Sequence, residues 1–367
     1  MISDDKLHLL LHLTRVPGLG PTRIRSLFSS MQSISQLKRC RTDHLAANPV
    51  IGPKYAADLT VFPVDEEIHN QLIRQVDDTG GWILPFWDER FPASLNRLSG
   101  MPTHLFGLGD PSALSAVSMA VVGTRIPTPY GKLAAEKLTT GLVQAGLTIV
   151  SGFARGIDTV AHQSCLAAGG TTVAVLGSGL GQIYPPENQP LVDDVCRTGC
   201  VITEYPPDSP PDARHFPDRN RIIAGLSLGT LVVEAADRGG ALITAAMALD
   251  MNREVFAVPG DIFQPRAVGT NRLIQNGQAK LVITAQDILQ ELPGFSGSGP
   301  RQPLPPPPDL TLFEAAIYDQ LSSTPVHVDV LADLVDRTTG DLLIQLLTME
   351  FKGLVRQLPG KYFIRMG

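Results

Sequence analysis

The residues of this chain best suited to binding an anionic ligand lie in one segment, Phe216 to Leu226. An aromatic residue, Phe216, is followed there by Arg219, Asn220 and Arg221. Guanidinium groups bind phosphate oxygens through paired hydrogen bonds, and an aromatic face can stack on any nucleobase. The same segment also fits a plain helix start with an acidic cap, a buried apolar stripe and solvated arginines. Other segments of the chain distinguish between these two interpretations.

Small and polar residues follow several predicted strands. The apolar run Ala120 to Val122 leads directly into Gly123, Thr124 and Arg125. In an open parallel sheet, ligands bind at the carboxyl ends of the strands, where helix N-termini present free N–H groups. Glycine lets the backbone approach a ligand closely, and successive N–H groups can bind an anion. Further loops of this kind are predicted to meet at one crevice; they lie at 151–158, 176–180 and 238–244.

Two familiar kinds of chemistry have weak support in this crevice. Gly123 does not open a G-x-G-x-x-G pattern, so a dehydrogenase that binds a dinucleotide is not indicated. Asp158 and His162 lie four residues apart on a predicted helix, which suggests an acid–imidazole pair. Such a pair could be catalytic, although it more often fixes a helix. We therefore predict no catalytic residue.

Composition narrows the class of protein. The 367 residues are 43% hydrophobic and 18% charged, with a net charge of −6. These values predict a globular protein of two or three domains in which any nucleic-acid site is a local basic patch. The four cysteines lack metal-ligand spacing, and no apolar run reaches the roughly 18 residues that span a bilayer. We expect no metal, no cofactor, no membrane role and a cytoplasmic location.

The middle of the chain, residues 80–293, alternates short apolar runs with amphipathic stretches, which is typical of βαβ units. Most of the runs are apolar throughout, so helices should cover both faces of the sheet. The predicted fold is therefore α/β, with a doubly wound, mostly parallel sheet. Its expected strands are 118–122, 148–151, 171–176, 201–203, 230–234, 254–258 and 280–283.

Two smaller domains are predicted to flank this sheet. Residues 1–75 resemble helix-hairpin-helix (SAM-like) units, which either touch DNA weakly or simply pack. A Gly, Ser and Pro-rich tether occupies 294–308. Residues 309–367 have the order helix, helix, helix, hairpin, which is that of a winged helix. Whether this last domain contacts DNA or only proteins is left open.

Together these segments resemble the DprA (DNA processing protein A, or Smf) family. The resemblance covers roughly residues 80 to 285 and rests on five or six long motifs in the family's order. It implies a Rossmann-like domain that binds single-stranded DNA and forms a homodimer. It further implies a non-catalytic mediator that loads RecA onto strands covered by single-strand-binding protein, during natural transformation and homologous recombination. The motifs are 121–125, 151–162, 174–180, 216–226, 255–260 and 269–277.

The resemblance also implies roles for single residues. Arg125 and either Arg219 or Arg221 would hold phosphates, and Phe216 would stack a base. Gly240 stands where many relatives have Ser, so one hydroxyl contact could be missing. The residues implied for single-stranded DNA binding are Gly123, Thr124, Arg125, Gly152, Gly177, Ser178, Gly179, Arg214, Phe216, Arg219, Asn220, Arg221, Gly240, Thr244 and Asn271.

Two alternatives compete with this interpretation. The first is a nucleotide phosphoribohydrolase of the LOG type, which shares the Rossmann-like superfamily and needs a catalytic Glu. The corresponding stretch here, Thr244 to Leu249, contains no carboxylate before Asp250, which counts against that enzyme. The second is a transcription regulator whose winged helix reads duplex DNA, and the tail has few basic residues for that role.

Overall fold

Helices α1 to α6 form the first part of the chain in this computed structural model, which describes residues 4–294, 310–322 and 324–366. Their core contains Leu9 and Leu13 of the first helix and Leu27 of the second. Gly18, with φ of +75°, makes the turn between those two helices. The predicted helical character is confirmed, and the last helix continues past residue 75. The bounds are α1 Asp4–Arg15, α2 Pro21–Phe28, α3 Ile34–Arg39, α4 Thr42–Ala46, α5 Gly52–Val61 and α6 Glu66–Asp78.

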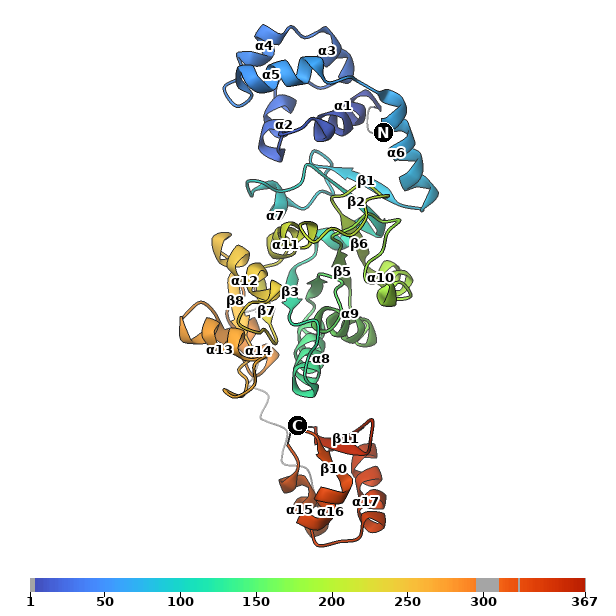
Figure 1. Ribbon diagram of the computed structural model, residues 1–367, viewed down its shortest axis with the longest axis vertical. Helices are drawn as coiled ribbons and strands as arrows, with labels where there is room; N and C mark the ends of the chain where they lie inside the picture. Colours follow the sequence, from blue (N-terminus) through green and yellow to red (C-terminus); the bar gives the residue numbers. More distant parts are fainter. Residues whose placement is uncertain (1–3, 295–309, 323, 367) are drawn as a thin grey trace.

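A sheet in the order β1-β2-β6-β5-β4-β3-β7-β8-β9 forms the centre of the molecule (Figure 1). Strands β3 to β9 pair with one another in parallel, whereas β2 runs antiparallel to both β1 and β6. The predicted doubly wound, mostly parallel sheet is confirmed; β1 and β2 were not predicted. The strands are β1 Trp82–Pro85, β2 His104–Gly109, β3 Ser118–Val122, β4 Thr148–Ser151, β5 Thr172–Val175, β6 Cys200–Thr203, β7 Gly229–Val232, β8 Glu254–Ala257 and β9 Lys280–Leu281.

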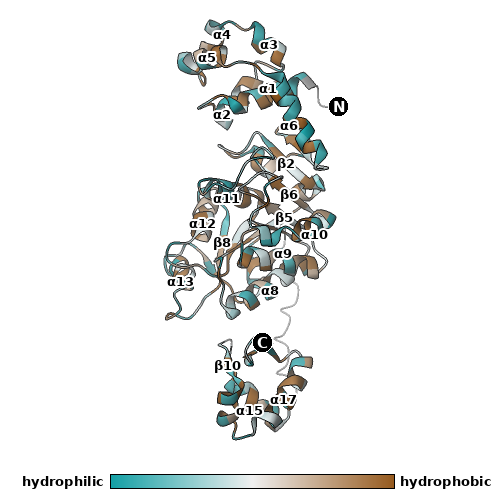
Figure 2. Ribbon diagram, turned by 45° about the vertical axis from the view of Figure 1, so that its right-hand side comes forward, coloured by the Kyte–Doolittle hydropathy of each residue, from teal (hydrophilic) through white to brown (hydrophobic). Residues whose placement is uncertain are grey.

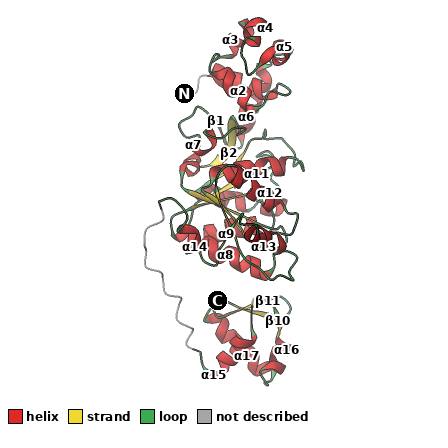
Figure 3. Ribbon diagram, turned by 90° about the vertical axis from the view of Figure 1, so that its left-hand side faces the viewer, coloured by secondary structure: helices red, strands yellow, loops and turns green. Residues whose placement is uncertain are grey.

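Helices cover both faces of the sheet, as Figure 3 shows. Along β3, Met119 and Val121 belong to the core under α8, α9 and α14, while Ala120 and Val122 pack under α11 and α12. This alternation follows from the two-residue period of a strand. The helices are α7 Ala93–Asn96, α8 Pro129–Gln144, α9 Ile157–Ala167, α10 Leu191–Thr198, α11 His215–Leu226, α12 Gly240–Asp250, α13 Val268–Gln275 and α14 Ala285–Leu289, with short 3-10 turns at Pro111–Ser115 and Pro186–Asn188.

Arg25 of α2 joins the N-terminal helices to the sheet. Its guanidinium donates to Asn96 Oδ1 at 2.6 Å and to the Pro102 carbonyl at 2.9 Å. The same group lies 4.7 Å from the ring centroid of Phe86, within range of a cation–π contact. Two hydrogen bonds and a ring contact therefore converge on one side chain at this junction.

The last part of the chain is a winged helix, as predicted, with three helices and a three-stranded sheet in the order β10-β12-β11. The short strand β10 was not predicted. Arg356 of β11 donates to the Glu136 carboxylate of α8 at 3.1 and 3.4 Å. The predicted tether lies almost entirely outside the described residues. The elements are α15 Leu312–Gln320, β10 Val326–His327, α16 Val328–Leu334, α17 Thr339–Phe351, β11 Val355–Leu358 and β12 Tyr362–Arg365.

Candidate nucleic-acid interface

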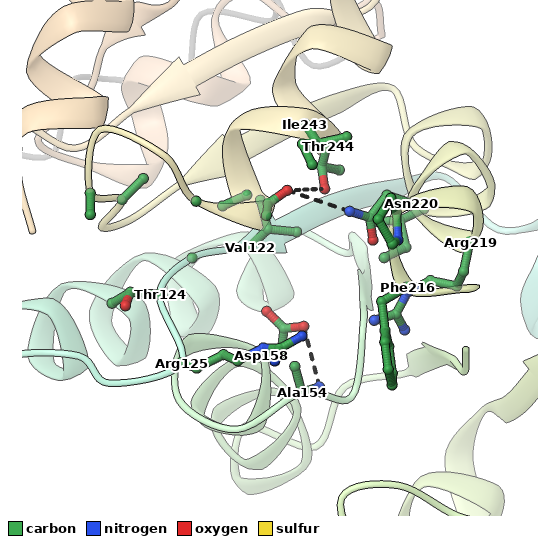
Figure 4. A pocket seen from close by; sticks show the side chains of 18 of the residues that line it. Val122, Thr124, Arg125, Ala154, Asp158, Phe216, Arg219, Asn220, Ile243 and Thr244 are labelled. Carbon is green, nitrogen blue, oxygen red and sulfur yellow. Dashed lines mark hydrogen bonds between the residues drawn. The ribbon is translucent and has the colours of Figure 1, made fainter. Parts of the chain in front are cut away.

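A pocket of about 670 Å³ opens at the carboxyl ends of β3, β4 and β7, with α11 as one wall and the start of α12 as another (Figure 4). This is the edge at which an open parallel sheet binds ligands. The structure brings eight of the predicted site residues to it: Gly123, Thr124, Arg125, Phe216, Arg219, Asn220, Gly240 and Thr244.

Phe216, the first aromatic residue of α11, is half-buried and forms part of the pocket wall. Its ring lies against Gly177, where an added Cβ would come 2.8 Å from Phe216 Cδ1. The Tyr184 ring lies 5.6 Å away, centroid to centroid, and the Arg125 guanidinium carbon lies 5.6 Å from the Phe216 centroid. The aromatic face is thus positioned by a glycine behind it and bordered by a cation.

Arg219 forms the floor of the pocket and is only 4% exposed. Its guanidinium donates to the carbonyl oxygens of Gly152 and Val175. Burial lowers the pKa of Arg219 to about 10, so the side chain is still a cation near neutral pH. Because two protein carbonyls already accept hydrogen bonds from Arg219, we assign it a structural role at the floor of the pocket and not the binding of a ligand phosphate.

Asp158 lies beside Arg219 at the floor and is the only carboxylate among the described residues that line the pocket. Burial raises the pKa of Asp158 to about 6, against the opposing influence of Arg219 and of the Ala154 N–H, which donates at 3.3 Å. An added Cβ at Gly152 would lie within 2.7 Å of both side chains. Gly152 is therefore required to make room for this pair.

Two exposed arginines line the pocket without an acidic partner in the described part of the chain, Arg125 after β3 and Arg238 after β7. Both are free to bind an anion. Arg238 was not among the predicted site residues. A signal was present in the sequence, because Arg238 lies in the glycine-containing loop 238–244 that was predicted to reach the crevice.

The start of α12 presents backbone N–H groups at the pocket. Gly240 has open space where a Cβ would stand, and it begins the helix. Asn220 Nδ2 and Thr244 Oγ1 each donate to the Gly240 carbonyl at 3.4 Å, which ties α11 to the first turn of α12. A helix N-terminus carries a partial positive charge and unpaired N–H groups, so this end favours an anion.

Gly177, Ser178 and Gly179, which were predicted to contact the ligand through their backbone, do not line this pocket. Gly177 is covered by the Phe216 ring, and Ser178 is fully buried. A Cβ at Gly179 would collide with the carbonyl oxygens of Pro206 and Pro207. The loop after β6 therefore covers this turn. Both glycines allow this close packing, because a Cβ at either position would clash.

Three further predicted residues lie outside the pocket. Arg214 is exposed and paired with Asp212 at 2.7 Å, and Arg221 points to the other side of α11, where it pairs with Glu204. Asn271 uses its side-chain amide to hold Gly260, accepting from its N–H at 3.1 Å and donating to its carbonyl at 2.9 Å. Neighbours on a helix point in different directions, which explains why Arg219 and Arg221 separate.

The suggested acid–imidazole pair does not form. The His162 ring nitrogen Nδ1 lies 2.7 Å from Thr172 Oγ1 instead of meeting Asp158. Burial lowers the pKa of His162 to about 3, so the imidazole is neutral. His162 is thus a core residue that holds α9 against β5.

No cluster that could hold a metal ion is present among the described residues. Within the same residues, no helix is long and apolar enough to cross a membrane.

The fold and the site together define a class: a Rossmann-like α/β protein with a cationic, aromatic pocket at its carboxyl edge and an appended winged helix. A family model described as DNA recombination-mediator protein A matches residues 82–293, and one described as the DprA winged helix domain matches 301–361. The chain belongs to the DprA family.

Two relatives match more than half of the chain. DNA processing protein DprA of Bacillus subtilis is 44% identical over 211 residues, or 57% of this chain and 71% of that protein. Protein Smf of Synechocystis is 32% identical over 396 aligned positions, or 96% of this chain and 97% of that protein.

Solved structures of the family match the chain as well. The X-ray structure of DprA from Streptococcus pneumoniae has a TM-score of 0.68 at 33% identity, covering 79% of this chain and 98% of that one. A structure of DprA from Helicobacter pylori, which concerns its single-stranded DNA binding mode, has a TM-score of 0.52 at 29% identity, covering 57% of this chain and 93% of that one.

Proposed function

We propose that this protein binds single-stranded DNA in the pocket at the carboxyl edge and acts there as a recombination mediator without catalytic activity. The observation that carries the proposal is the combination of an aromatic face, Phe216, with two exposed and unpaired arginines, Arg125 and Arg238. A base stacks on such a face whatever its identity, while cations hold the backbone. The binding mode of the Helicobacter pylori relative supports the same ligand.

Each wall of the pocket has a part in this proposal. Phe216 stacks one base, and Arg125 and Arg238 bind the phosphates on either side of it. The first turn of α12 at Gly240 offers N–H groups to a third anionic oxygen. Arg219 contributes a buried positive charge below the strand without leaving its two carbonyl partners.

The decisive measurement compares a labelled oligo-dT strand with a duplex of the same length in a fluorescence anisotropy titration. We expect the strand to bind far more tightly and its affinity to fall as salt rises, since bound phosphates release counterions. Phe216→Ala should weaken binding of the strand, because base stacking contributes about 1 to 3 kcal/mol per base. Equal affinity for strand and duplex would refute the proposal.

If the protein were instead a phosphoribohydrolase, Asp158 would be the pocket residue to act as its general acid, because its pKa of about 6 suits that role. Its carboxylate is buried, accepts from the Ala154 N–H and lies beside Arg219, so it is committed to the floor. Incubation with AMP should therefore release no free adenine. Release of adenine that is lost in Asp158→Asn would favour the enzyme instead.

Family membership supports the remaining parts of the proposal. We infer that the protein loads RecA onto strands covered by single-strand-binding protein during natural transformation, and that it forms a homodimer through the Rossmann-like part. A RecA filament assay on strands precoated with single-strand-binding protein tests the loading of RecA. Sedimentation of the purified protein tests whether it forms a homodimer. We also propose that 1–75, 80–293 and 309–367 fold as domains, with limited proteolysis at 294–308 as the test.

A further inference from the structure

An exposed apolar stripe runs along α17 of the winged helix. Ile344 is 69% exposed, Leu347 is 53% exposed and Phe351 is 85% exposed. Their spacings of three and four residues place them on one face of the helix. Figure 2 shows hydrophobic ribbon along this helix. Contiguous exposed side chains of this size indicate an interaction surface, whereas scattered ones need no explanation.

The charges on this part of the chain argue against DNA as the ligand. In a winged helix that reads duplex DNA, the helix at the position of α17 enters the major groove. Such binding depends on Lys and Arg that neutralise phosphates. Helices α15, α16 and α17 contain no Lys or Arg in their sequences, but they contain six acidic residues: Glu314, Asp319, Asp329, Asp333, Asp341 and Glu350.

Two of the four cations that follow α17 are held in ion pairs. Lys352 donates to the Glu314 carboxylate at 2.5 Å, and Arg356 pairs with Glu136 of α8. At the other end, neither Asp329 nor Asp341 forms an ion pair with Lys or Arg among the described residues. Asp329 lies 3.5 Å from His327 Nδ1 and accepts from Thr339 Oγ1 at 3.2 Å. Asp341 accepts at 2.8 Å from the hydroxyl of Thr338, the N-cap residue of α17, and the neighbouring Arg337 lies over the Phe313 ring. The stripe therefore has an acidic N-terminal end.

We propose that the α17 stripe is a docking surface for a segment of a partner protein that carries apolar side chains along its length and Lys or Arg at one end. The apolar side chains would cover Ile344, Leu347 and Phe351, and the cations would face Asp329 and Asp341. A second copy of the same helix is a poor occupant, because it would bring a second set of carboxylates to the acidic end. This surface is separate from the pocket and does not depend on the function proposed for it.

The test uses the full chain and a labelled amphipathic helical peptide of about 18 residues, long enough to form a helix on binding. One version has a leucine face with lysines at one end, and the other has glutamates in their place. The double variant Ile344→Gln, Phe351→Gln removes the stripe. Val61→Gln is the matched control, since Val61 is 81% exposed on α5, away from the winged helix.

We expect the lysine peptide to bind the wild type and the Val61→Gln control equally, and the double variant at least about tenfold more weakly, or 1.4 kcal/mol. The glutamate peptide should bind more weakly than the lysine peptide. Unchanged binding to the double variant, or no binding of either peptide to the wild type, would overturn the proposal. So would a loss of duplex DNA binding or of self-association in the double variant, which would identify the occupant as DNA or as a second copy. Single-strand binding should be the same in all variants.

Discussion

Removing the two free arginines of the pocket should change both the affinity for single-stranded DNA and its dependence on salt. Arg125 and Arg238 are exposed, line the pocket and have no acidic partner in the described residues, so Arg125→Ala with Arg238→Ala leaves no buried charge uncompensated. This distinguishes them from Arg219, whose loss would leave the carbonyls of Gly152 and Val175 without their donor. The double variant should therefore fold normally.

The expected loss follows from the number of contacts. A hydrogen bond to a charged group contributes about 1.5 to 3 kcal/mol, and the exposure of both side chains favours the lower figure. Two such contacts give about 3 kcal/mol, which is a factor of roughly 150 in the dissociation constant. Each phosphate contact on a single strand also contributes about −0.7 to the slope of log K against log salt, so loss of two contacts should make this slope less negative by about 1.4.

Anisotropy titrations with labelled oligo-dT at several salt concentrations measure both quantities. Arg214→Ala is the matched control, because its side chain is 86% exposed but is paired with Asp212 and lies outside the pocket. A double variant with the wild-type salt slope would refute the assignment of phosphates to these arginines. An equal loss in the Arg214→Ala control would show that general surface charge, rather than the pocket, holds the strand.

Three more substitutions test single features. Gly177→Ala should weaken strand binding with little loss of stability, since its Cβ would push the Phe216 ring; wild-type affinity would show that the ring is not the platform. Asp158 has a folded pKa of about 6 against 3.8 ordinarily, so its stabilising contribution is complete below pH 3.8 and lost as pH rises through about 6. The affinity for single-stranded DNA should also fall as pH rises through about 6, because a negative charge appears in the pocket. Asp158→Asn should flatten this pH profile in anisotropy titrations. His12, fully buried with both ring nitrogens unpartnered among the described residues, has its pKa lowered to about 4 by burial and by Arg15, so stability present above pH 6.5 is lost as pH falls through about 4. His12→Leu should reduce this acid sensitivity and raise the unfolding free energy by about 1 kcal/mol in urea titrations; a variant with unchanged acid sensitivity would contradict this account.

The parallel part of the sheet was predictable because its strands are apolar throughout and end in glycine or polar loops. Strand β3 shows this clearly, with Ser118 to Val122 fully buried between helices. Strand β2 escaped prediction because His104–Gly109 contains two glycines and has no helix after it, so no βαβ pattern marks it. Strand β10 has two residues and forms only by pairing with β12, which local sequence does not indicate.

The pocket was predictable in outline and not in detail. Strand ends and glycine loops indicated the edge of the sheet at which the pocket lies, because topology alone brings them together. The direction of each side chain depends on packing that the sequence does not display. Gly179 lies under the loop after β6, and Asn271 holds the backbone of Gly260, although both come from motifs that looked like ligand contacts.

Two arginines of helix α11 contact different parts of the protein, and this has a consequence for any mutational survey. Arg219 and Asn220 lie in the pocket, whereas Arg221 pairs with Glu204, which lines a second cavity of about 410 Å³ beside α1 and α6. Substitutions at 219 and 221 should therefore produce unlike phenotypes despite their closeness in sequence. Defects at Arg221 should appear in the attachment of the N-terminal helices, so a scan that groups positions by motif would mix two separate traits.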